Sequence, residues 1–247
     1  MRHRKMLAAG FALLAVCLGL LLPVQAQARN YAKAKYKTNR WEWMKKDFLN
    51  TDTDRLIFVK YKGGSKAAVE MWKKVEVITE TVEGEEAAEP VYTWKRILAV
   101  NGYVGKNGIN KKREGDKKTP TGTFHITAAF GIKKSPGTAG ISYKKINKYH
   151  YWSGEKATYN TFVDVRKIGR KSIAGEHLID YVPFYHYGLT MDFNKECVYK
   201  KGSAIFFHCT KPGRKYTAGC VAIPESKMKK VVKNTTKHTM IFIYKEK

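Results

Sequence analysis

The sequence has little cysteine, few acidic residues and no clustered histidines, and each scarcity narrows the chemistry. Its seven histidines are scattered without the close spacing of a zinc site, so the sequence predicts no metal centre. Internal repeats and long low-complexity tracts are also absent, which argues against a repeat architecture. At 247 residues, the chain is long enough to bury one sizeable core.

The first residues have the pattern of an export signal. Arg2, Arg4 and Lys5 precede an almost wholly apolar stretch, Met6–Val24, and Ala26–Ala28 is a small-x-small cleavage site. We therefore predict a signal peptide over residues 1–28 and an extracytoplasmic protein, either associated with the cell wall or secreted. The alternative is an uncleaved anchor, because about 19 apolar residues can just cross a bilayer.

Basic residues greatly outnumber acidic ones. The chain has 47 Lys and Arg against 21 Asp and Glu, for a net charge of +26. Such a surface attracts polyanions. No RNA-binding or DNA-binding motif is present, so we do not expect nucleic acid as a partner. For an exported protein, anionic wall polymers are the expected partners, and contact with a membrane is expected only through the signal segment if it stays uncleaved.

Three cysteines follow the predicted signal peptide: Cys197, Cys209 and Cys220. An odd number in an exported protein leaves one thiol free, and Cys220 is the candidate. Cys197 and Cys209 lie on neighbouring strand patterns and could form a disulfide in an oxidising compartment, a possibility that the sequence leaves open.

One stretch near the C-terminus carries the pattern of a nucleophilic site. The apolar run Ala204–Phe207 predicts a strand that ends at His208, and after a polar loop the chain reads Thr217-Ala-Gly-Cys220. Because only the thiolate attacks, an imidazole that takes the thiol proton can activate Cys220. Gly219 lets backbone N–H groups approach a reacting carbonyl. The alternative is that Cys220 is a small buried apolar residue and His208 an ordinary strand-end histidine.

Strand alternation separates two neighbouring residues. His208 shares a face with Ala204 and Phe206, whereas Cys209 points to the other face with Ile205 and Phe207. We therefore expect His208 in the site and the Cys209 side chain in the core.

An apolar strand ending in His, a short loop and then Ser/Thr-x-Gly-Cys resembles the catalytic signature of the L,D-transpeptidases of bacterial cell walls. Upstream blocks are similar to one branch of that family, and the resemblance extends from about Arg55 to the end of the chain. These blocks are Asn101–Gly108, Glu114–Phe124 and Tyr159-Asn160. The chain departs from the common motif at Ala218, where the family usually has His, and at Ala222, where it usually has Arg; both changes resemble a sub-branch with Thr-Ala-Gly-Cys.

The resemblance implies a cysteine-dependent acyl transfer on peptidoglycan stem peptides, without a metal or other cofactor. It implies that Cys220 is the nucleophile, that His208 is the base, and that the carbonyl of Cys209 orients the imidazole ring. The N–H groups of Gly219 and Cys220 would line the oxyanion hole, and we assign Thr217, which opens the motif, to positioning.

Two other functions stay open. If water enters instead of an amine, the same thioacyl intermediate makes the protein an L,D-carboxypeptidase. The protein is alternatively a non-catalytic basic wall-binding module with a decayed site, a reading that Ala218 favours and that the retained His208 and Cys220 oppose.

The strand patterns predict a mainly β fold. We expect a mixed twisted sheet or sandwich with one or two short helices, which the resemblance makes L,D-transpeptidase-like, in a monomer. Residues 29–50 are expected to form a linker or packing segment, in which residues 39–48 could make a short helix or simply pack on the domain, and residues 51–247 the catalytic domain.

Local patterns give further expectations. Leu56–Tyr61 and Ala67–Trp72 predict a hairpin; 92–100 predicts a strand that ends at Asn101-Gly102, and 79–86 a solvated acidic tip. Residues 136–153 are expected to be irregular, 176–181 a short helix, 185–193 a strand, 225–233 a helix and 239–244 a final strand. Tyr187, Tyr159 and Asn160 are the candidates for binding substrate. His125 and His186 are weaker candidates for the site.

Overall fold

The computed structural model describes residues 40–77 and 90–245. The predicted signal peptide and the predicted acidic tip at 79–86 lie outside the described residues. No described helix is long and apolar enough to cross a membrane. The helices are α2 (Arg40–Asp47) and α3 (Glu225–Asn234), and the strands are β1 (Arg55–Gly63), β2 (Lys66–Val77), β3 (Val91–Tyr103), β4 (Gly122–Gly131), β5 (Tyr143–Lys145), β6 (His150–Ser153), β7 (Phe162–Asp164), β8 (Gly175–His177), β9 (Gly188–Met191), β10 (Phe206–Thr210), β11 (Val221–Pro224) and β12 (Thr239–Lys245).

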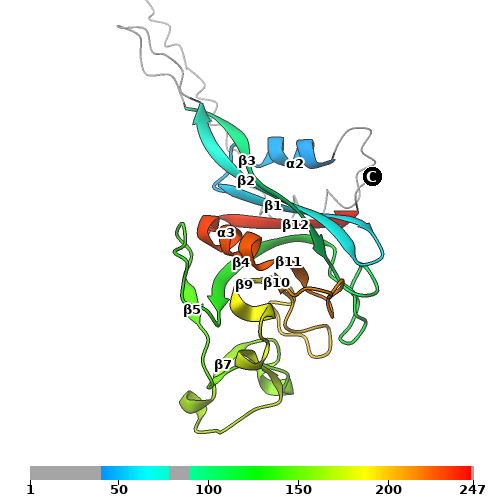
Figure 1. Ribbon diagram of the computed structural model, residues 1–247, viewed down its shortest axis with the longest axis vertical. Helices are drawn as coiled ribbons and strands as arrows, with labels where there is room; N and C mark the ends of the chain where they lie inside the picture. The colour runs from blue at the N-terminus through cyan, green and yellow to red at the C-terminus, as the bar shows by residue number, and fades with distance from the viewer. Residues whose placement is uncertain (1–39, 78–89, 246–247) are drawn as a thin grey trace, which may run out of the picture.

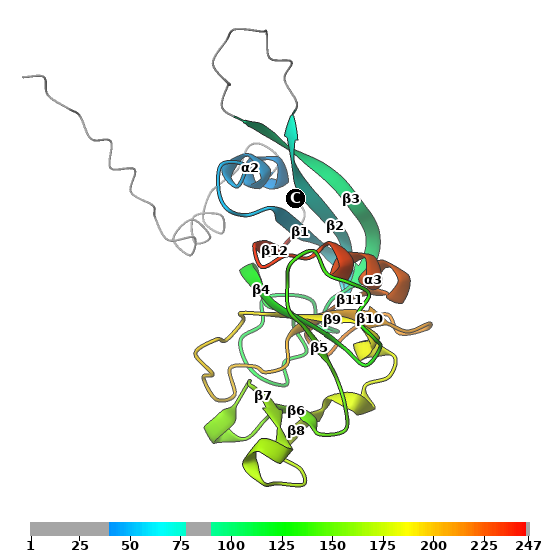
Figure 2. The ribbon, with the colours of Figure 1, turned by 90° about the vertical axis from the view of Figure 1, so that its left-hand side faces the viewer.

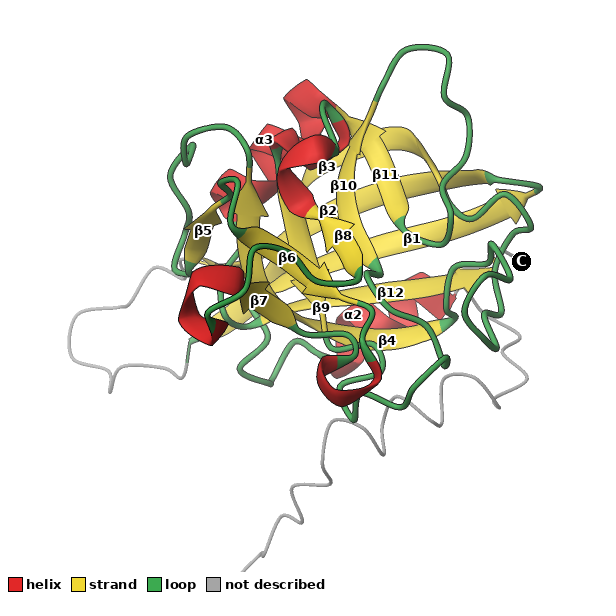
Figure 3. Ribbon diagram, turned by 90° about the horizontal axis from the view of Figure 1, so that it is seen from below, coloured by secondary structure: helices red, strands yellow, loops and turns green. Residues whose placement is uncertain are grey.

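Nine strands form one large sheet in the order β12-β1-β2-β3-β11-β10-β9-β4-β5. Because β12 also pairs with β4, every strand except β5 belongs to a closed ring, and Figure 3 shows these strands curving around one another. The pairs β1–β12, β10–β11 and β4–β5 are parallel and the others antiparallel. The predicted mainly β fold with a mixed twisted sheet and short helices is confirmed.

The main core lies on one face of this sheet. Alternate residues of β1 and β12, such as Ile57 and Ile241, point into it, and α3 adds Met228, Val231 and Val232. These side chains are fully buried, so the apolar surface that they remove from water is the main stabilising term of the fold. The predicted hairpin, the helix over 225–233 and the final strand are confirmed by β1–β2, α3 and β12.

A second apolar cluster covers the other face of β1 and β12 beneath α2. Trp41, Met44 and Phe48 pack there against Phe58 and Phe242. These contacts involve the described part of the predicted linker or packing segment, and its residues 29–39 lie outside the described residues.

A third cluster lies at the opposite end of the molecule from α2 (Figures 1 and 2), between the large sheet and a small sheet of order β7-β6-β8. Phe130 and Phe206 contribute from the large sheet, Trp152 from β6 of the small sheet, and Leu178 from the 3₁₀ turn that follows β8. This cluster contains Cys220, so the small sheet covers the face on which the site is built.

Some local predictions are wrong. The predicted helix over 176–181 is β8 followed by a 3₁₀ turn, Leu178–Asp180, because β8 pairs with β6. A Cβ at Gly175 would lie 2.2 Å from the Trp152 carbonyl oxygen, so glycine permits this close pairing. The segment 136–153 is less irregular than predicted, since it contains β5 and β6.

Other errors concern where strands begin and end. Strand β3 continues through Asn101-Gly102 to Tyr103, and Gly102 allows this since a Cβ there would meet the Ala222 carbonyl oxygen at 2.8 Å. The predicted strand over 185–193 starts instead as a 3₁₀ turn, Phe184–His186, and only β9 is extended.

Candidate active site

Strands β10 and β11 bring His208 and Cys220 to one side of the large sheet. The two strands are parallel with His208 opposite Ala222, so Cys220 precedes β11 by one residue and shares the face of Ala222. Both side chains are largely buried, at 6% and 7% exposure, and both line one cavity of about 130 Å³. The sequence prediction that His208 ends its strand is wrong. Strand β10 starts at Phe206, after Ala204 with its left-handed φ of 54°, and His208 stands at its centre.

The His208 ring is held by the backbone. Nδ1 lies 2.7 Å from the carbonyl oxygen of Cys209. Because a carbonyl only accepts, Nδ1 carries the hydrogen and Nε2 is the ring atom with a lone pair. Tyr185 and Phe184 pack edge-on against the ring, with centroids 5.4 and 6.1 Å away. Burial lowers the pKa of His208 to about 4, which the bond to Cys209 only partly opposes.

The Cys220 thiol has two backbone partners. Its Sγ donates to the Ala204 carbonyl oxygen at 3.1 Å and accepts from the Phe206 N–H at 3.3 Å. Burial and, after it, the charge of Glu176 together raise the pKa of Cys220 to about 12, against the opposing effects of the Phe206 N–H and Lys111. The pair is therefore a neutral thiol and a neutral imidazole in one cavity, and the thiol S–H donates a hydrogen bond to the Ala204 carbonyl.

Asn160 fixes Ala204, whose carbonyl accepts this hydrogen bond. Its Oδ1 accepts from the Ala204 N–H at 3.2 Å and from Trp152 Nε1 at 2.9 Å, while Nδ2 donates to the Phe193 and Asn194 carbonyls. Asn160 does not line the cavity, so it holds the Cys220 surroundings rather than facing a substrate. The sequence identified Asn160 as a substrate-binding candidate and missed this contact.

Tyr159 and Tyr187 also lie away from the cavity. Tyr159 is 1% exposed, and its hydroxyl accepts from the Gly202 N–H at 3.2 Å. Tyr187 belongs to the main core with Cys209, whose Sγ donates to the Tyr187 carbonyl at 3.4 Å. Instead, Tyr185 reaches the cavity, because the chain forms a 3₁₀ turn there and the assumed strand alternation does not apply.

Two threonines hold the backbone of the Cys220 loop. Thr217 Oγ1 donates to the Cys220 carbonyl at 2.7 Å, and Thr119 Oγ1 donates to the same oxygen at 3.0 Å. The Gly219 N–H donates to Thr217 Oγ1 at 3.1 Å. To donate to an oxyanion, the Gly219 N–H would have to leave Thr217 Oγ1 or donate to both oxygens at once. The oxyanion role of Gly219 stays a prediction.

Glycine at 219 has a backbone reason. Its φ is 153°, and a Cβ would lie 3.0 Å from the Lys118 carbonyl oxygen. The loop that supplies Lys118 therefore presses directly against the residue before Cys220.

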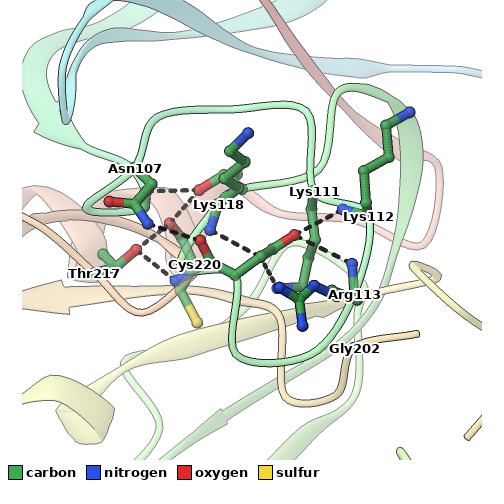
Figure 4. A network of polar contacts seen from close by, with 12 residues as sticks. Asn107, Lys111, Lys112, Arg113, Lys118, Gly202, Thr217 and Cys220 are labelled. Atoms are coloured by element: carbon green, nitrogen blue, oxygen red, sulfur yellow. Dashed lines mark hydrogen bonds and ion pairs between the residues drawn. The ribbon is translucent and has the colours of Figure 1, made fainter. Parts of the chain in front are cut away.

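That loop is itself organised around Asp116, and Figure 4 labels the residues that bond to its carboxylate. Its carboxylate accepts from Lys111 Nζ at 2.8 Å and from the N–H groups of Lys112, Arg113 and Lys118 at 2.7 to 3.1 Å. Burial raises the pKa of Asp116, but these hydrogen bonds outweigh it and hold the pKa well below its ordinary value. The Cys220 sulfur extends away from this network.

The cavity continues the site with residues that the sequence did not single out. Glu176, Tyr181, Tyr185 and Arg214 line it beside Cys220. Arg214 and Thr210 also line a neighbouring larger cavity of about 860 Å³, to which Lys211 and Lys215 contribute. Glu176 could not be placed from the sequence, because a helix was predicted where the chain forms β8.

The remaining candidates lie elsewhere. His125 Nδ1 is 3.2 Å from Asp192 Oδ2, and His186 Nδ1 is 2.7 Å from Glu225 Oε2; neither histidine lines the cavity. Cys197, Cys209 and Cys220 are all free thiols. Over residues 40–77 and 90–245, no group of three or more His, Cys, Asp or Glu side chains is arranged to hold a metal ion.

Comparison with known protein families gives a match over most of the described chain. The model of the YkuD family, described as an L,D-transpeptidase catalytic domain, matches residues 77–243, about two thirds of the chain. No curated protein matches the sequence. The matched range contains β10, β11, the Asp116 loop and the small sheet.

Proposed function

The chain belongs to the L,D-transpeptidase catalytic domain family, and from this premise we propose that it is an exported cysteine enzyme that transfers acyl groups of peptidoglycan stem peptides. The observation that carries the proposal is the shared cavity of Cys220 and His208, with Nδ1 of the imidazole bound to the Cys209 carbonyl. That bond leaves Nε2 to take a proton from the thiol.

In the first half-reaction, the Cys220 thiol turns from the Ala204 carbonyl and gives its proton to His208 Nε2. The sulfur forms a bond to the carbonyl carbon of the third stem residue, and the Phe206 N–H, 3.3 Å from Sγ, stabilises the negative charge on sulfur. The C–N bond to the terminal D-alanine breaks, and its nitrogen takes the proton from His208. A thioester on Cys220 and a neutral His208 remain.

The burial of the pair favours a concerted transfer. Desolvation opposes both the free thiolate and the imidazolium, as the pKa values of about 12 and about 4 indicate. Proton transfer therefore accompanies attack, rather than preceding it as a stored ion pair. The N–H groups of Gly219 and Cys220 are the proposed donors to the oxyanion.

The second half-reaction uses an amine from a neighbouring stem. The larger cavity that shares Thr210 and Arg214 with the site offers room for an extended substrate, and Lys211 and Lys215 suit its carboxylates. The basic surface as a whole suits anionic wall polymers. Export rests on the N-terminal pattern alone.

The test is incubation of the purified protein with a stem tetrapeptide, followed by intact mass of the enzyme and mass analysis of the products. We expect an adduct of the tripeptide acyl group on Cys220, absent from Cys220→Ala, together with cross-linked dimers. Tripeptide without dimer would identify a carboxypeptidase. A protein without any adduct, or equal product formation by Cys220→Ala, would overturn the proposal.

A further inference from the structure

The active-site cavity contains a carboxylate for which the mechanism above has no use. Glu176 lines the cavity with Cys220 and His208, although the chain has more than twice as many basic as acidic residues. Strand β8 delivers it from the small sheet, and the close pairing at Gly175 fixes that strand against β6. The carboxylate is thus a built part of the cavity wall.

One oxygen of this carboxylate is anchored. The Tyr185 hydroxyl donates to Glu176 Oε2 at 2.5 Å. Tyr185 is fixed in turn by stacking on Tyr181, with centroids 4.8 Å apart, and by edge contacts with Phe206 and His208. Among the described residues, none donates a hydrogen bond to Oε1 and no cation forms an ion pair with Glu176.

An unpaired carboxylate is unfavourable for the first half-reaction. After burial itself, the charge of Glu176 is the next cause that raises the pKa values of Cys220, Tyr181 and Tyr185. It therefore opposes formation of the thiolate. A cation that arrives later in the reaction would remove this cost and explain the placement.

The second half-reaction brings such a cation. An acceptor amine is an ammonium ion at neutral pH and must lose a proton before it can attack a thioester. We propose that Glu176 binds the acceptor ammonium and takes its proton, delivering a neutral amine to the thioester on Cys220. This inference rests on the proposed function, since it assigns the acceptor side of the same site.

The protons balance through two groups. The ammonium gives one proton to Glu176 Oε1, and the neutral amine attacks the thioester carbon. The amine nitrogen gives a second proton to His208 Nε2, the C–S bond breaks, and the departing sulfur takes that proton to restore the thiol. Glu176 then releases its proton to water.

The acidity of Glu176 suits this task. Burial raises its pKa to about 7, although the Tyr185 hydroxyl opposes the shift. A carboxyl with that pKa is a stronger base than an ordinary glutamate, which lies near 4.3, and still loses its proton at neutral pH. The groups that line the cavity with it and titrate or carry charge are Tyr181, Tyr185, Tyr216, Arg214, His208 and Cys220.

The test separates the two half-reactions with Glu176→Gln, which keeps an oxygen for Tyr185. With a stem tetrapeptide as donor and acceptor, we expect thioacyl formation at least as fast as in the unmodified protein. Dimer formation should fall about 100-fold, the lower range for loss of a general base, while tripeptide from hydrolysis rises. The dependence of dimer formation on pH near 7 should disappear. The matched control is Glu155→Gln, whose carboxylate pairs with Arg170 outside the cavity and should leave both half-reactions unchanged.

Each other outcome has a definite meaning. Unchanged dimer formation in Glu176→Gln would overturn the inference. Equal loss of acylation and transfer, with an unchanged melting temperature, would place Glu176 in the donor step and also overturn it. If the unmodified protein forms no adduct, the proposed function itself has failed. If the protein forms an adduct but no dimer, the acceptor is water and the inference fails while cysteine acylation stands.

Discussion

Two buried thiols lie on opposite faces of the large sheet, Cys209 on β10 and Cys220 directly before β11, and they have similar pKa values but different surroundings. Burial raises the pKa of both Cys209 and Cys220 to about 12. Cys209 is fully buried in the main core, where its thiol donates a hydrogen bond to the Tyr187 carbonyl. Cys220 lines a cavity with an imidazole, a carboxylate and a backbone N–H beside its sulfur.

Burial and pKa therefore do not distinguish the core thiol of Cys209 from the thiol that we propose as the nucleophile. What separates the two thiols is that Cys220, unlike Cys209, lines a cavity together with His208. His208 belongs to the face of Cys220, although it is covalently next to Cys209. The alternation of β10 therefore places the imidazole in the cavity of Cys220, on the face opposite to the Cys209 side chain.

The most direct test of the difference between the two thiols is to make the same substitution at both. Cys220→Ser should lower thioacyl formation by about 10⁴-fold or more, because loss of the nucleophile removes a group that acts together with its base. Cys209→Ser should stay within about threefold, since its hydroxyl can donate to the Tyr187 carbonyl. Single-turnover acylation followed by intact mass measures both. Comparable losses in the two variants would contradict the assignment of Cys220.

Removing the base should have the next largest effect. His208→Gln is expected to lower acylation by about 10² to 10⁴-fold, the usual range for general acid–base groups. Since the thiol then lacks an acceptor for its proton, the remaining rate should rise with pH towards the thiol pKa. Stopped assays from pH 6 to 10 give this profile. A flat profile with an unchanged rate would show that His208 takes no proton.

The sequence predicted the cysteine, the histidine and the motif around them, but not the other residues that line the cavity. Alternation placed Cys209 in the core, as found, because a strand fixes side-chain direction locally. Thr217 and Gly219 were identified from the motif. In the structure, the Thr217 hydroxyl donates to the Cys220 carbonyl and accepts from the Gly219 N–H.

What the sequence could not predict depends on distant pairing. Glu176 lies on a three-residue strand whose formation depends on β6, so the local pattern suggested a helix. Asn160 was identified, but its contact with Ala204 crosses 44 positions and gives no local signal. Tyr187 was expected near the cavity on the assumption of a strand, and the 3₁₀ turn places Tyr185 there instead. Long-range contacts thus decide which neighbours surround a locally predicted pair.

Burial of His208 also affects the stability of the protein in acid. The pKa of His208 is about 4 when folded and 6.5 when exposed, so the unfolded chain binds the proton first as the pH falls. Stability from this group is fully present above about pH 6.5 and is lost towards pH 4, by about 3 kcal/mol. The raised pKa of Glu176 makes the folded state more stable as the pH falls, but this contribution is the same in the unmodified protein and in His208→Gln. Urea unfolding at several pH values should show a smaller acid loss for His208→Gln; parallel curves would contradict this.

The smallest expected difference concerns stability at the two thiols. Cys209→Ala leaves a gap in a close-packed core and should cost about 1 to 2 kcal/mol of unfolding free energy, in the range for deleting one buried heavy atom group. Cys220→Ala should cost less, about 0.5 kcal/mol, because its side chain borders a cavity where lost contacts are fewer and water can enter. Urea unfolding of both variants at pH 7 measures the difference. Substitution of Cys220 would then have the larger effect on acylation, and substitution of Cys209 the larger effect on the free energy of unfolding. A larger loss for Cys220→Ala would mean that its bonds to Ala204 and Phe206 hold the fold together, and that the reactive face is also a structural one.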